Sequence, residues 1–148
     1  MAHLKFTRRP IPVLSELRPV YKIAQALLIL HITGHGGKSS LVKIHLMNWA
    51  LKRPERALAL RSGAESGQLH LPIWGFDPAM AIALNLAFQD KLITQTTTGG
   101  FALSTAGLAY VKLILADDSI LSEEKAALHS IGKKITEKMV TSVSKEWD

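Results

Sequence analysis

Three sequence features that lie close together in the chain predict a mainly α-helical domain. Residues 79–90 form an apolar stretch long enough for a helix, and the strand-like segments 92–97 and 101–103 follow it. Gly99 and Gly100 separate the two strands, and a diglycine tolerates the positive φ of a tight hairpin turn. A second apolar helix follows the hairpin. This order is that of the helix-plus-wing half of a winged helix-turn-helix domain, so we expect a winged helix-turn-helix-like core with a short β-hairpin.

Residues 1–18 are expected to form an extended N-terminal arm. They contain Pro10 and Pro12 among isolated apolar residues, and proline fixes φ and removes a backbone donor. The apolar residues indicate that the arm lies on a surface, either the protein's own core or a partner. Pro19 then occupies a favourable first-turn position, and apolar residues at helical spacing predict a helix that ends at Thr33.

Serine and proline mark the starts of the next two helices. A glycine-rich loop follows Thr33, and Ser39 or Ser40 is expected to cap the second helix. Pro54 opens a third, short helix that we expect to end near Arg61. Residues 69–74 are strand-like but are interrupted by a proline.

The remaining helices also begin at capping residues. Asp77 followed by proline predicts the start of the helix that runs to about residue 90, and Ser104 is expected to cap a helix to Ala116. Ser122 is expected to cap one last helix, along which Leu128, Ile131, Ile135 and Met139 form an apolar stripe. The chain thus divides into an arm (1–18), a winged-helix-like domain (19–116) and a C-terminal helix (117–148).

Composition restricts the class of protein. Hydrophobic residues make up 47% of the 148 residues and charged residues 20%, as in folded globular proteins. The absence of cysteine excludes disulfides and cysteine-ligated metal sites, and with no recognisable leader it favours the cytoplasm. The most apolar run, residues 23–32, is about half the length of a membrane span, so no membrane association is expected.

The net charge of +6 is concentrated in the N-terminal half. Residues 38–61 hold six cations against one acid, whereas residues 62–120 hold two lysines against five acids. A basic face suits nucleic acid or an acidic partner, although an ordinary solvated surface has the same composition. The candidates for DNA contact are Lys38, Lys43, Lys52, Arg53 and Arg56.

Signals for catalysis are weak. Residues 36–40 (GGKSS) imitate a phosphate-binding loop, but Ile32 stands where the full motif requires glycine, and the alternating strands and helices of a nucleotide-binding sheet are missing. No histidine pair has metal-ligand spacing on one helix, and the adjacent Asp117 and Asp118 suit a solvated turn. We therefore expect a non-enzymatic protein with no cofactor and no metal.

The helix in the position of a DNA-reading helix is unsuited to that role. Residues 79–90 contain no lysine or arginine, and only Asn85 and Gln89 resemble base-reading side chains. The expected wing tip, residues 95–100, is also uncharged. This helix is therefore expected to be buried or to face another protein. The candidates for partner contact are Phe6, Arg8, Arg9, Ile11, Val13, Asn85, Phe88 and Trp147.

Three segments carry a resemblance to a known family. They are Arg18-Pro19-x-Tyr21-x-Ile23-Ala24-Gln25, Gly37-Lys38-Ser39-Ser40-Leu41 and His45-Leu46-x-Asn48-Trp49-Ala50-Leu51, with Phe101-x-Leu103-Ser104-x-x-Gly107 in the hairpin region. In these segments the chain resembles the small middle components of bacterial three-component systems built around an ABC-type or SMC-like ATPase, including Lamassu-type defence systems.

The resemblance implies a non-enzymatic adaptor subunit that links an SMC-like or ABC-type ATPase to an effector, commonly a nuclease, in anti-phage or anti-plasmid defence. It also implies a nonspecific contact with DNA through the complex. The alternative is a free-standing, dimeric winged-helix transcriptional regulator that binds duplex DNA, and an ATP-binding protein is the third hypothesis.

Overall fold

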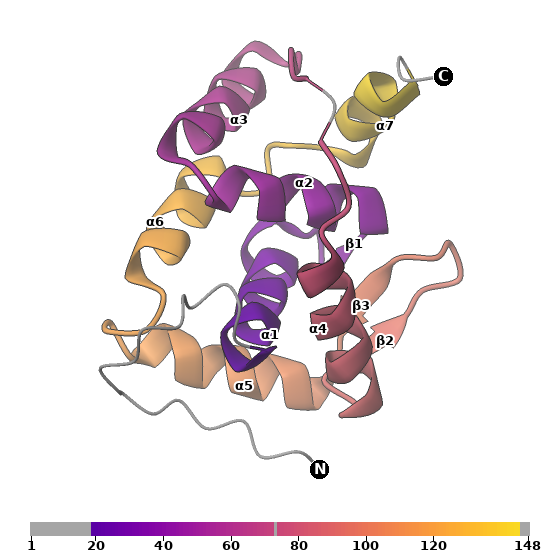
Figure 1. The fold of residues 1–148 in the computed structure, drawn as a ribbon, viewed down its shortest axis with the longest axis vertical. Helices are drawn as coiled ribbons and strands as arrows, with labels where there is room; N and C mark the ends of the chain where they lie inside the picture. Colours follow the sequence, from indigo (N-terminus) through magenta and orange to yellow (C-terminus); the bar gives the residue numbers. More distant parts are fainter. Residues whose placement is uncertain (1–18, 73, 146–148) are drawn as a thin grey trace.

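The computed structural model describes residues 19–72 and 74–145, and its core is built around helix α1 (Pro19–Leu28). Every residue of α1 from Lys22 to Leu28 is buried, and the helix packs on α4 and α5. In Figure 1, α1 lies in the middle of the molecule with the other helices around it. Most of these buried residues are apolar, but Lys22 and Gln25 are polar and are buried with them.

The end of this first helix widens into the π-helical turn η2 (Ile29–Thr33), which stops at Gly34. The Thr33 hydroxyl donates to the carbonyl oxygen of Ile29 at 2.6 Å within that turn. Gly34 is required there, because a Cβ would lie 2.5 Å from the carbonyl oxygens of both Leu30 and Lys38. The predicted helix end at Thr33 is thus confirmed.

Helices α2 (Leu41–Leu51) and α3 (Pro54–Ser66) follow and pack on each other. Ser40 caps α2, because its side-chain oxygen accepts from the backbone N–H of Lys43 at 3.2 Å. Helix α3 begins at Pro54 as predicted but continues past Arg61 to Ser66, and Gly67 with φ of 79° ends it. Gly63 lies inside the helix just beyond the expected end, where the backbone passes close to the side chain of Leu69, which a glycine permits.

The hairpin is part of a small antiparallel sheet. Strands β2 (Ile93–Gln95) and β3 (Phe101–Leu103) form the predicted hairpin, with Gly99 at φ of 88° in its turn. A third strand, β1 (Lys38–Ser39), pairs with β3, so the strand order is β1-β3-β2. The sequence predicts no strand at these two residues, which directly follow the glycine-rich loop.

Helix α4 (Pro78–Gln89) precedes the hairpin, and α5 (Thr105–Ala116) follows it with Ser104 as its cap. Figure 1 places α4 between the hairpin and α1, and α5 across one end of the molecule. Gly107 allows α5 to approach the hairpin, because a Cβ there would overlap the carbonyl oxygen of Leu92. The strand-like residues 69–72 form no strand, and Trp74 beyond them is buried in the core.

The expected single C-terminal helix is two helices, α6 (Ser122–Ile131) and α7 (Glu137–Lys145). Gly132, at φ of 60°, interrupts them, and the Thr136 hydroxyl accepts from the N–H of Met139 to start α7. Ser122 is not the cap of α6; Leu121 holds that position in a left-handed conformation. Leu128, Ile131 and Ile135 are buried in the chain's own core, so this part of the stripe is not exposed to a second copy.

The described residues thus form a mainly helical protein, as predicted, and the predicted hairpin is part of a three-stranded sheet. None of these helices has the length and apolar character needed to cross a bilayer.

Candidate functional site

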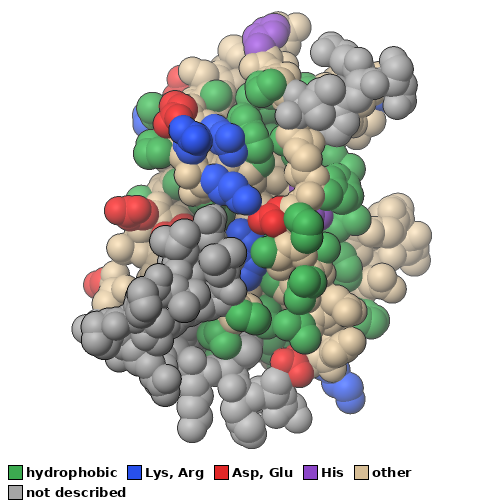
Figure 2. All heavy atoms as spheres, in the orientation of Figure 1, with side chains coloured by type: hydrophobic (Ala, Val, Ile, Leu, Met, Phe, Trp, Pro, Cys, Tyr) green, Lys and Arg blue, Asp and Glu red, His purple; other side chains and the backbone are tan. Residues whose placement is uncertain are grey.

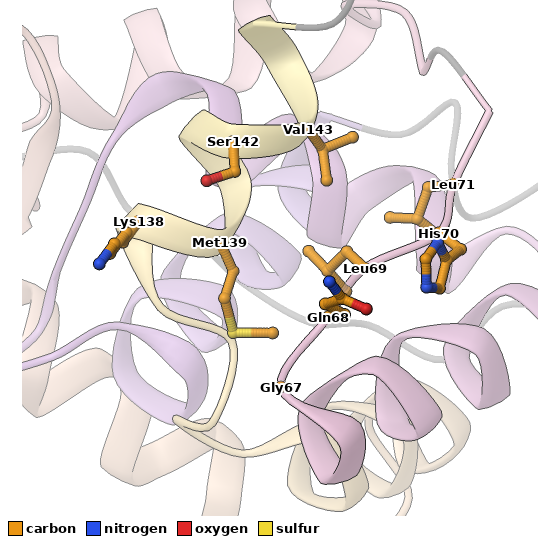
Figure 3. A pocket seen from close by; sticks show the side chains of 9 residues that line it. All are labelled: Gly67, Gln68, Leu69, His70, Leu71, Lys138, Met139, Ser142 and Val143. Atoms are coloured by element: carbon orange, nitrogen blue, oxygen red, sulfur yellow. The ribbon is translucent and has the colours of Figure 1, made fainter.

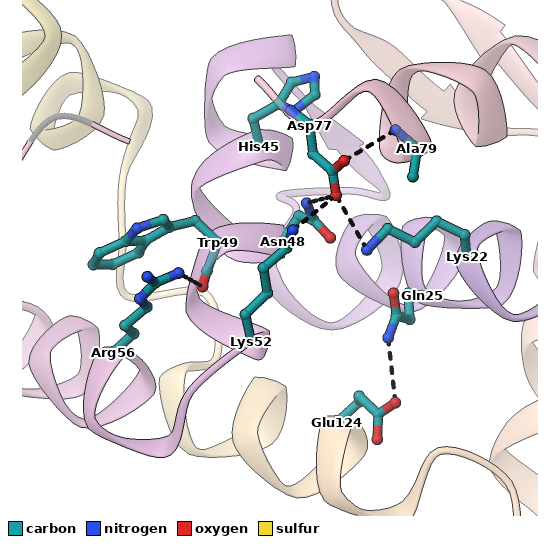
Figure 4. Close-up of polar contacts among 10 residues, drawn as sticks. All are labelled: Lys22, Gln25, His45, Asn48, Trp49, Lys52, Arg56, Asp77, Ala79 and Glu124. Carbon is teal, nitrogen blue, oxygen red and sulfur yellow. Dashed lines mark hydrogen bonds and ion pairs between the residues drawn. The ribbon is translucent and has the colours of Figure 1, made fainter. Parts of the chain in front are cut away.

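The start of α4 is joined to α1 and α2 by one carboxylate, Asp77 (Figure 4). Its Oδ1 accepts from the backbone N–H of Ala79 at 3.0 Å, which caps α4 as predicted. Its Oδ2 accepts from the Asn48 side chain at 3.0 Å and pairs with Lys52 at 3.1 Å and Lys22 at 3.5 Å. One side chain therefore fixes the direction in which α4 leaves the core.

These contacts determine the protonation of Asp77. Burial alone would raise the pKa of this carboxyl group, because burial disfavours the charged form. Hydrogen bonds from Asn48, from the Ala79 backbone and from Lys52, together with the charge of Lys22, outweigh burial and lower the pKa well below its ordinary value. Asp77 is thus ionised at neutral pH.

His45 on α2 supports the same junction. Its Nδ1 accepts from the backbone N–H of Asp77 at 3.2 Å, and its ring stacks on Phe76 with centroids 4.0 Å apart. Burial lowers the pKa of His45, the charge of Asp77 opposes that shift, and Lys22 adds to it. A neutral imidazole is required, because a protonated Nδ1 has no lone pair to accept the Asp77 N–H.

Beyond this junction, the outer face of α4 is apolar and uncharged. We call its exposed residues the α4 surface: Ala81, Ile82, Asn85, Phe88 and Gln89. Ile82 is 58% exposed and Phe88 is 42% exposed, and both belong to the few large hydrophobic side chains of the described residues that face solvent. Figure 2 shows hydrophobic side chains gathered over this helix. The predicted partner-contact residues Asn85 and Phe88 thus lie on one exposed face.

The five predicted DNA-contact residues do not form one patch. Lys52, Arg53 and Arg56 lie together at the turn between α2 and α3, where Arg56 lies over the Trp49 ring at 4.6 Å and donates to its carbonyl oxygen at 3.1 Å. Lys38 is exposed on β1, at the opposite end of α2. Eleven helical residues separate the two ends, which corresponds to about 16 Å.

The prediction for Lys43 is wrong. This lysine is fully buried, and its Nζ donates to the carbonyl oxygen of Thr33 at 2.8 Å. Burial lowers the pKa of Lys43, whereas the nearby carboxylate of Glu137 raises it. The ammonium group lies at the C-terminal end of the first helical segment, where a positive charge is favourable and a carbonyl lacks a helical partner. Lys43 therefore has a structural contact and no surface available to DNA.

The loop that imitates a phosphate-binding motif has a different structure. Lys38 belongs to a strand and pairs with Ala102. At the start of α2, the backbone N–H and the hydroxyl of Ser40 donate to the Glu137 carboxylate at 3.0 and 2.6 Å. An acidic side chain from α7 thus occupies the helix N-terminus where a phosphate would bind.

Two other features of the structure bear on ligand binding. A hollow of about 700 Å³ lies between α7 and the segment after α3, lined among others by Leu69, His70, Met139 and Val143 (Figure 3). Its polar groups do not converge on one point in that view. Within residues 19–72 and 74–145, no group of three or more histidine or carboxylate side chains is placed to hold a metal.

Six predicted partner-contact residues lie outside the described residues: Phe6, Arg8, Arg9, Ile11, Val13 and Trp147. Some contacts that the structure reveals were not predicted from the sequence. The role of Asp77 as a cap was evident from its position before proline, but its pairing with Lys22 joins segments 55 residues apart and left no local signal. Glu137 at the start of α2 was missed for the same reason.

Comparison of the chain with protein-family models, curated proteins and solved structures found no match.

Proposed function

We propose that this chain is a non-enzymatic adaptor subunit that binds a partner protein through the α4 surface. The observation that carries the proposal is the chemistry of that surface. Two large apolar side chains, Ile82 and Phe88, are exposed beside the neutral Asn85 and Gln89, and no lysine or arginine lies on α4. Apolar side chains exposed together on one helix are typical of protein-binding surfaces.

The proposal includes a winged helix-turn-helix frame, in which α4 takes the position of the reading helix. Support comes from the order of elements: α1, β1 and α2 precede α4, the hairpin of β2 and β3 follows it, and β1 pairs with β3. Helix α3 is then an insertion between the second and third helices of the motif. In a DNA-binding member, the helix in this position enters the major groove.

The α4 surface is unfavourable for DNA. Binding to duplex DNA gains much of its free energy when cations on the protein displace counterions from phosphates. Helix α4 has no such cation, and residues 93–103, which form the hairpin, are also uncharged. If this surface bound DNA, Ile82 and Phe88 would be placed next to phosphates, and no release of counterions would contribute to the affinity. Burial of the same two side chains against another protein would instead contribute favourably to the free energy of binding.

The identity of the partner in this proposal rests on the family resemblance of the sequence. The partner is an SMC-like or ABC-type ATPase, and the complex joins it to an effector, a nuclease in the commonest arrangement, in defence against phage or plasmids. Lys52, Arg53 and Arg56 form the cationic group available to DNA held by the complex, whereas Lys43 is excluded by its burial. Such contacts are nonspecific, because they read phosphate charge.

The test uses the full chain co-expressed with the products of its neighbouring genes. Ile82→Glu with Phe88→Glu places two charges on the α4 surface, and we expect the affinity for the ATPase to fall at least 100-fold. Burial of each side chain is worth about 1.5–3 kcal/mol, and 1.4 kcal/mol corresponds to tenfold. Leu113→Glu is the matched control, since Leu113 is an exposed apolar residue, 69% accessible, on α5.

Two outcomes would contradict the proposal. One is retention of wild-type affinity by the double variant while Leu113→Glu loses it. The other is a sequence-specific shift of duplex DNA by the isolated wild-type chain with a steep salt dependence, which the regulator hypothesis predicts.

A further inference from the structure

A groove separates the turn between α2 and α3 from the first turns of α6. It has a volume of about 770 Å³, and we call it the α6 groove. One wall carries Lys52 and Arg53, and the other carries Glu123 and Glu124. Between them the surface is made of small and apolar residues, among them Ala50, Ala57 and Ala127.

Gln25, from the central helix α1, lines the same groove with an unpartnered oxygen. The side chain is 94% buried, since only 6% of its surface is exposed. Its Nε2 donates to Oε2 of Glu124 at 3.2 Å, as Figure 4 shows. A carboxylate accepts hydrogen bonds only, so the amide nitrogen must point at Glu124, and Oε1 is then the atom that lacks a donor. A buried carbonyl of this kind is expected to accept from a donor, either a water molecule or a side chain.

The charges of the groove determine which donor fits. Lys52 is paired with Asp77 at 3.1 Å, and Arg53 lies 3.8 Å from Glu55. Neither Glu123 nor Glu124 forms an ion pair within residues 19–72 and 74–145. The charges beside Gln25 are therefore the negative charges of Glu123 and Glu124, which have no cation paired with them in the part of the chain that the structure describes. A guanidinium or ammonium group satisfies both the carbonyl and the carboxylates, because each is a cation with several N–H donors.

We propose that the N-terminal arm, residues 1–18 of the same chain, occupies the α6 groove and donates a basic side chain to Gln25 and Glu124. The arm carries Lys5, Arg8, Arg9 and Arg18 against the single acid Glu16, so its charge complements the acidic wall. Its apolar residues, with no side chain larger than phenylalanine, match the alanine-rich surface between the walls.

The length of the arm also suits this position. The arm joins α1 at Pro19, and Gln25 lies six residues further along, or about 9 Å. Eighteen extended residues span up to about 60 Å, so Lys5, Arg8 and Arg9 all lie within reach. Because the arm is covalently attached to α1, its effective concentration at the groove is high, and it binds there more readily than the same peptide free in solution.

The experiment measures paramagnetic relaxation in the full 148-residue chain. The sequence has no cysteine, so Ala126→Cys gives a single nitroxide site on the exposed rim of the groove. We expect the label to broaden the backbone amide signals of Lys5, Phe6, Arg8 and Arg9. The matched control is Thr98→Cys at the tip of the hairpin, which lies on the opposite side of the molecule from α6 in Figure 1 and should leave these signals sharp.

A charge variant tests the chemistry. Glu123→Gln with Glu124→Gln keeps an acceptor for Gln25 Nε2 but removes both charges, and we expect the broadening to fall at least fivefold while the circular dichroism stays unchanged. Sharp arm signals with the Ala126 label would overturn the proposal, as would equal broadening from both label positions. Undiminished broadening in the charge variant would overturn the pairing with Glu124.

Discussion

Replacement of Asp77 separates its two roles, capping α4 and neutralising cations. Asp77→Ser keeps a side-chain oxygen that accepts from Ala79 N–H but removes the carboxylate that holds Asn48, Lys22 and Lys52. Asp77→Ala removes both functions. Comparison of the two variants therefore isolates the cap, which is worth about 1 kcal/mol.

The magnitude follows from the burial of the three donors. Lys22 is 3% exposed and loses the carboxylate that pairs with it, at a cost of about 2 kcal/mol. Asn48 is buried and loses an acceptor, at a cost of about 1 kcal/mol. Lys52 is 38% exposed, so solvent screening reduces its contribution to a few tenths of a kcal/mol, about 0.3. We expect Asp77→Ser to lower the free energy of unfolding by about 3 kcal/mol and Asp77→Ala by about 4 kcal/mol.

Urea denaturation followed by circular dichroism measures these differences, and its pH dependence tests the cause. The pKa of Asp77 is lowered in the folded state, so its contribution is complete above the unfolded-chain pKa of about 3.9 and is lost as pH falls below it. The gap between wild type and Asp77→Ser should therefore be constant from pH 5 upward and shrink toward pH 3. A serine variant within about 0.5 kcal/mol of wild type at pH 7, the size of a neutral surface change, would refute the reasoning. So would a gap that is unchanged at pH 3.

Three other changes give equally direct expectations. Gly107→Ala should destabilise the protein by about 2 kcal/mol, because its Cβ overlaps the Leu92 carbonyl oxygen, whereas Gly75→Ala, with open space around it, should change the melting temperature little. Burial lowers the pKa of His45, so the contribution of this residue to stability is present above its unfolded pKa of about 6.5 and is lost as pH falls. Between pH 7 and 5, wild type should therefore lose stability relative to His45→Gln, by at most about 1.4 kcal/mol per pH unit. Stability curves of the two proteins that stay parallel over this range would contradict this expectation. In the proposed complex, Lys52→Gln with Arg53→Gln should weaken nonspecific DNA binding and reduce its salt slope by up to about 2, and an unchanged slope would exclude this turn from DNA contact.

Local chemistry accounts for the parts of the fold that the sequence predicted correctly. Ser40, Asp77 and Ser104 all cap helices where they were expected, because a capping side chain acts on backbone groups two or three residues away. The diglycine hairpin turn was predictable for the same reason. The neutral outer face of α4 also followed from composition, since no cation lies in that helix.

The errors concern contacts between distant parts of the chain. Strand β1 has only two residues and exists because β3, more than 60 residues later, pairs with it. Lys43 was expected at the surface because lysine is rarely buried, but the open Thr33 carbonyl provides a partner that no local pattern reveals. The break between α6 and α7 did have a local signal, Gly132 followed by the capping residue Thr136, but the apolar stripe across it concealed that signal.

The shortness of the sheet limits how this protein can associate. Its two edges are β1, with two residues, and β2, with three, and edges of this length offer too few backbone groups to recruit a strand from another chain. A partner protein would therefore bind to side chains of the helices and not to a strand edge. An interface of that kind can be changed by single substitutions at exposed helical positions while the fold remains intact.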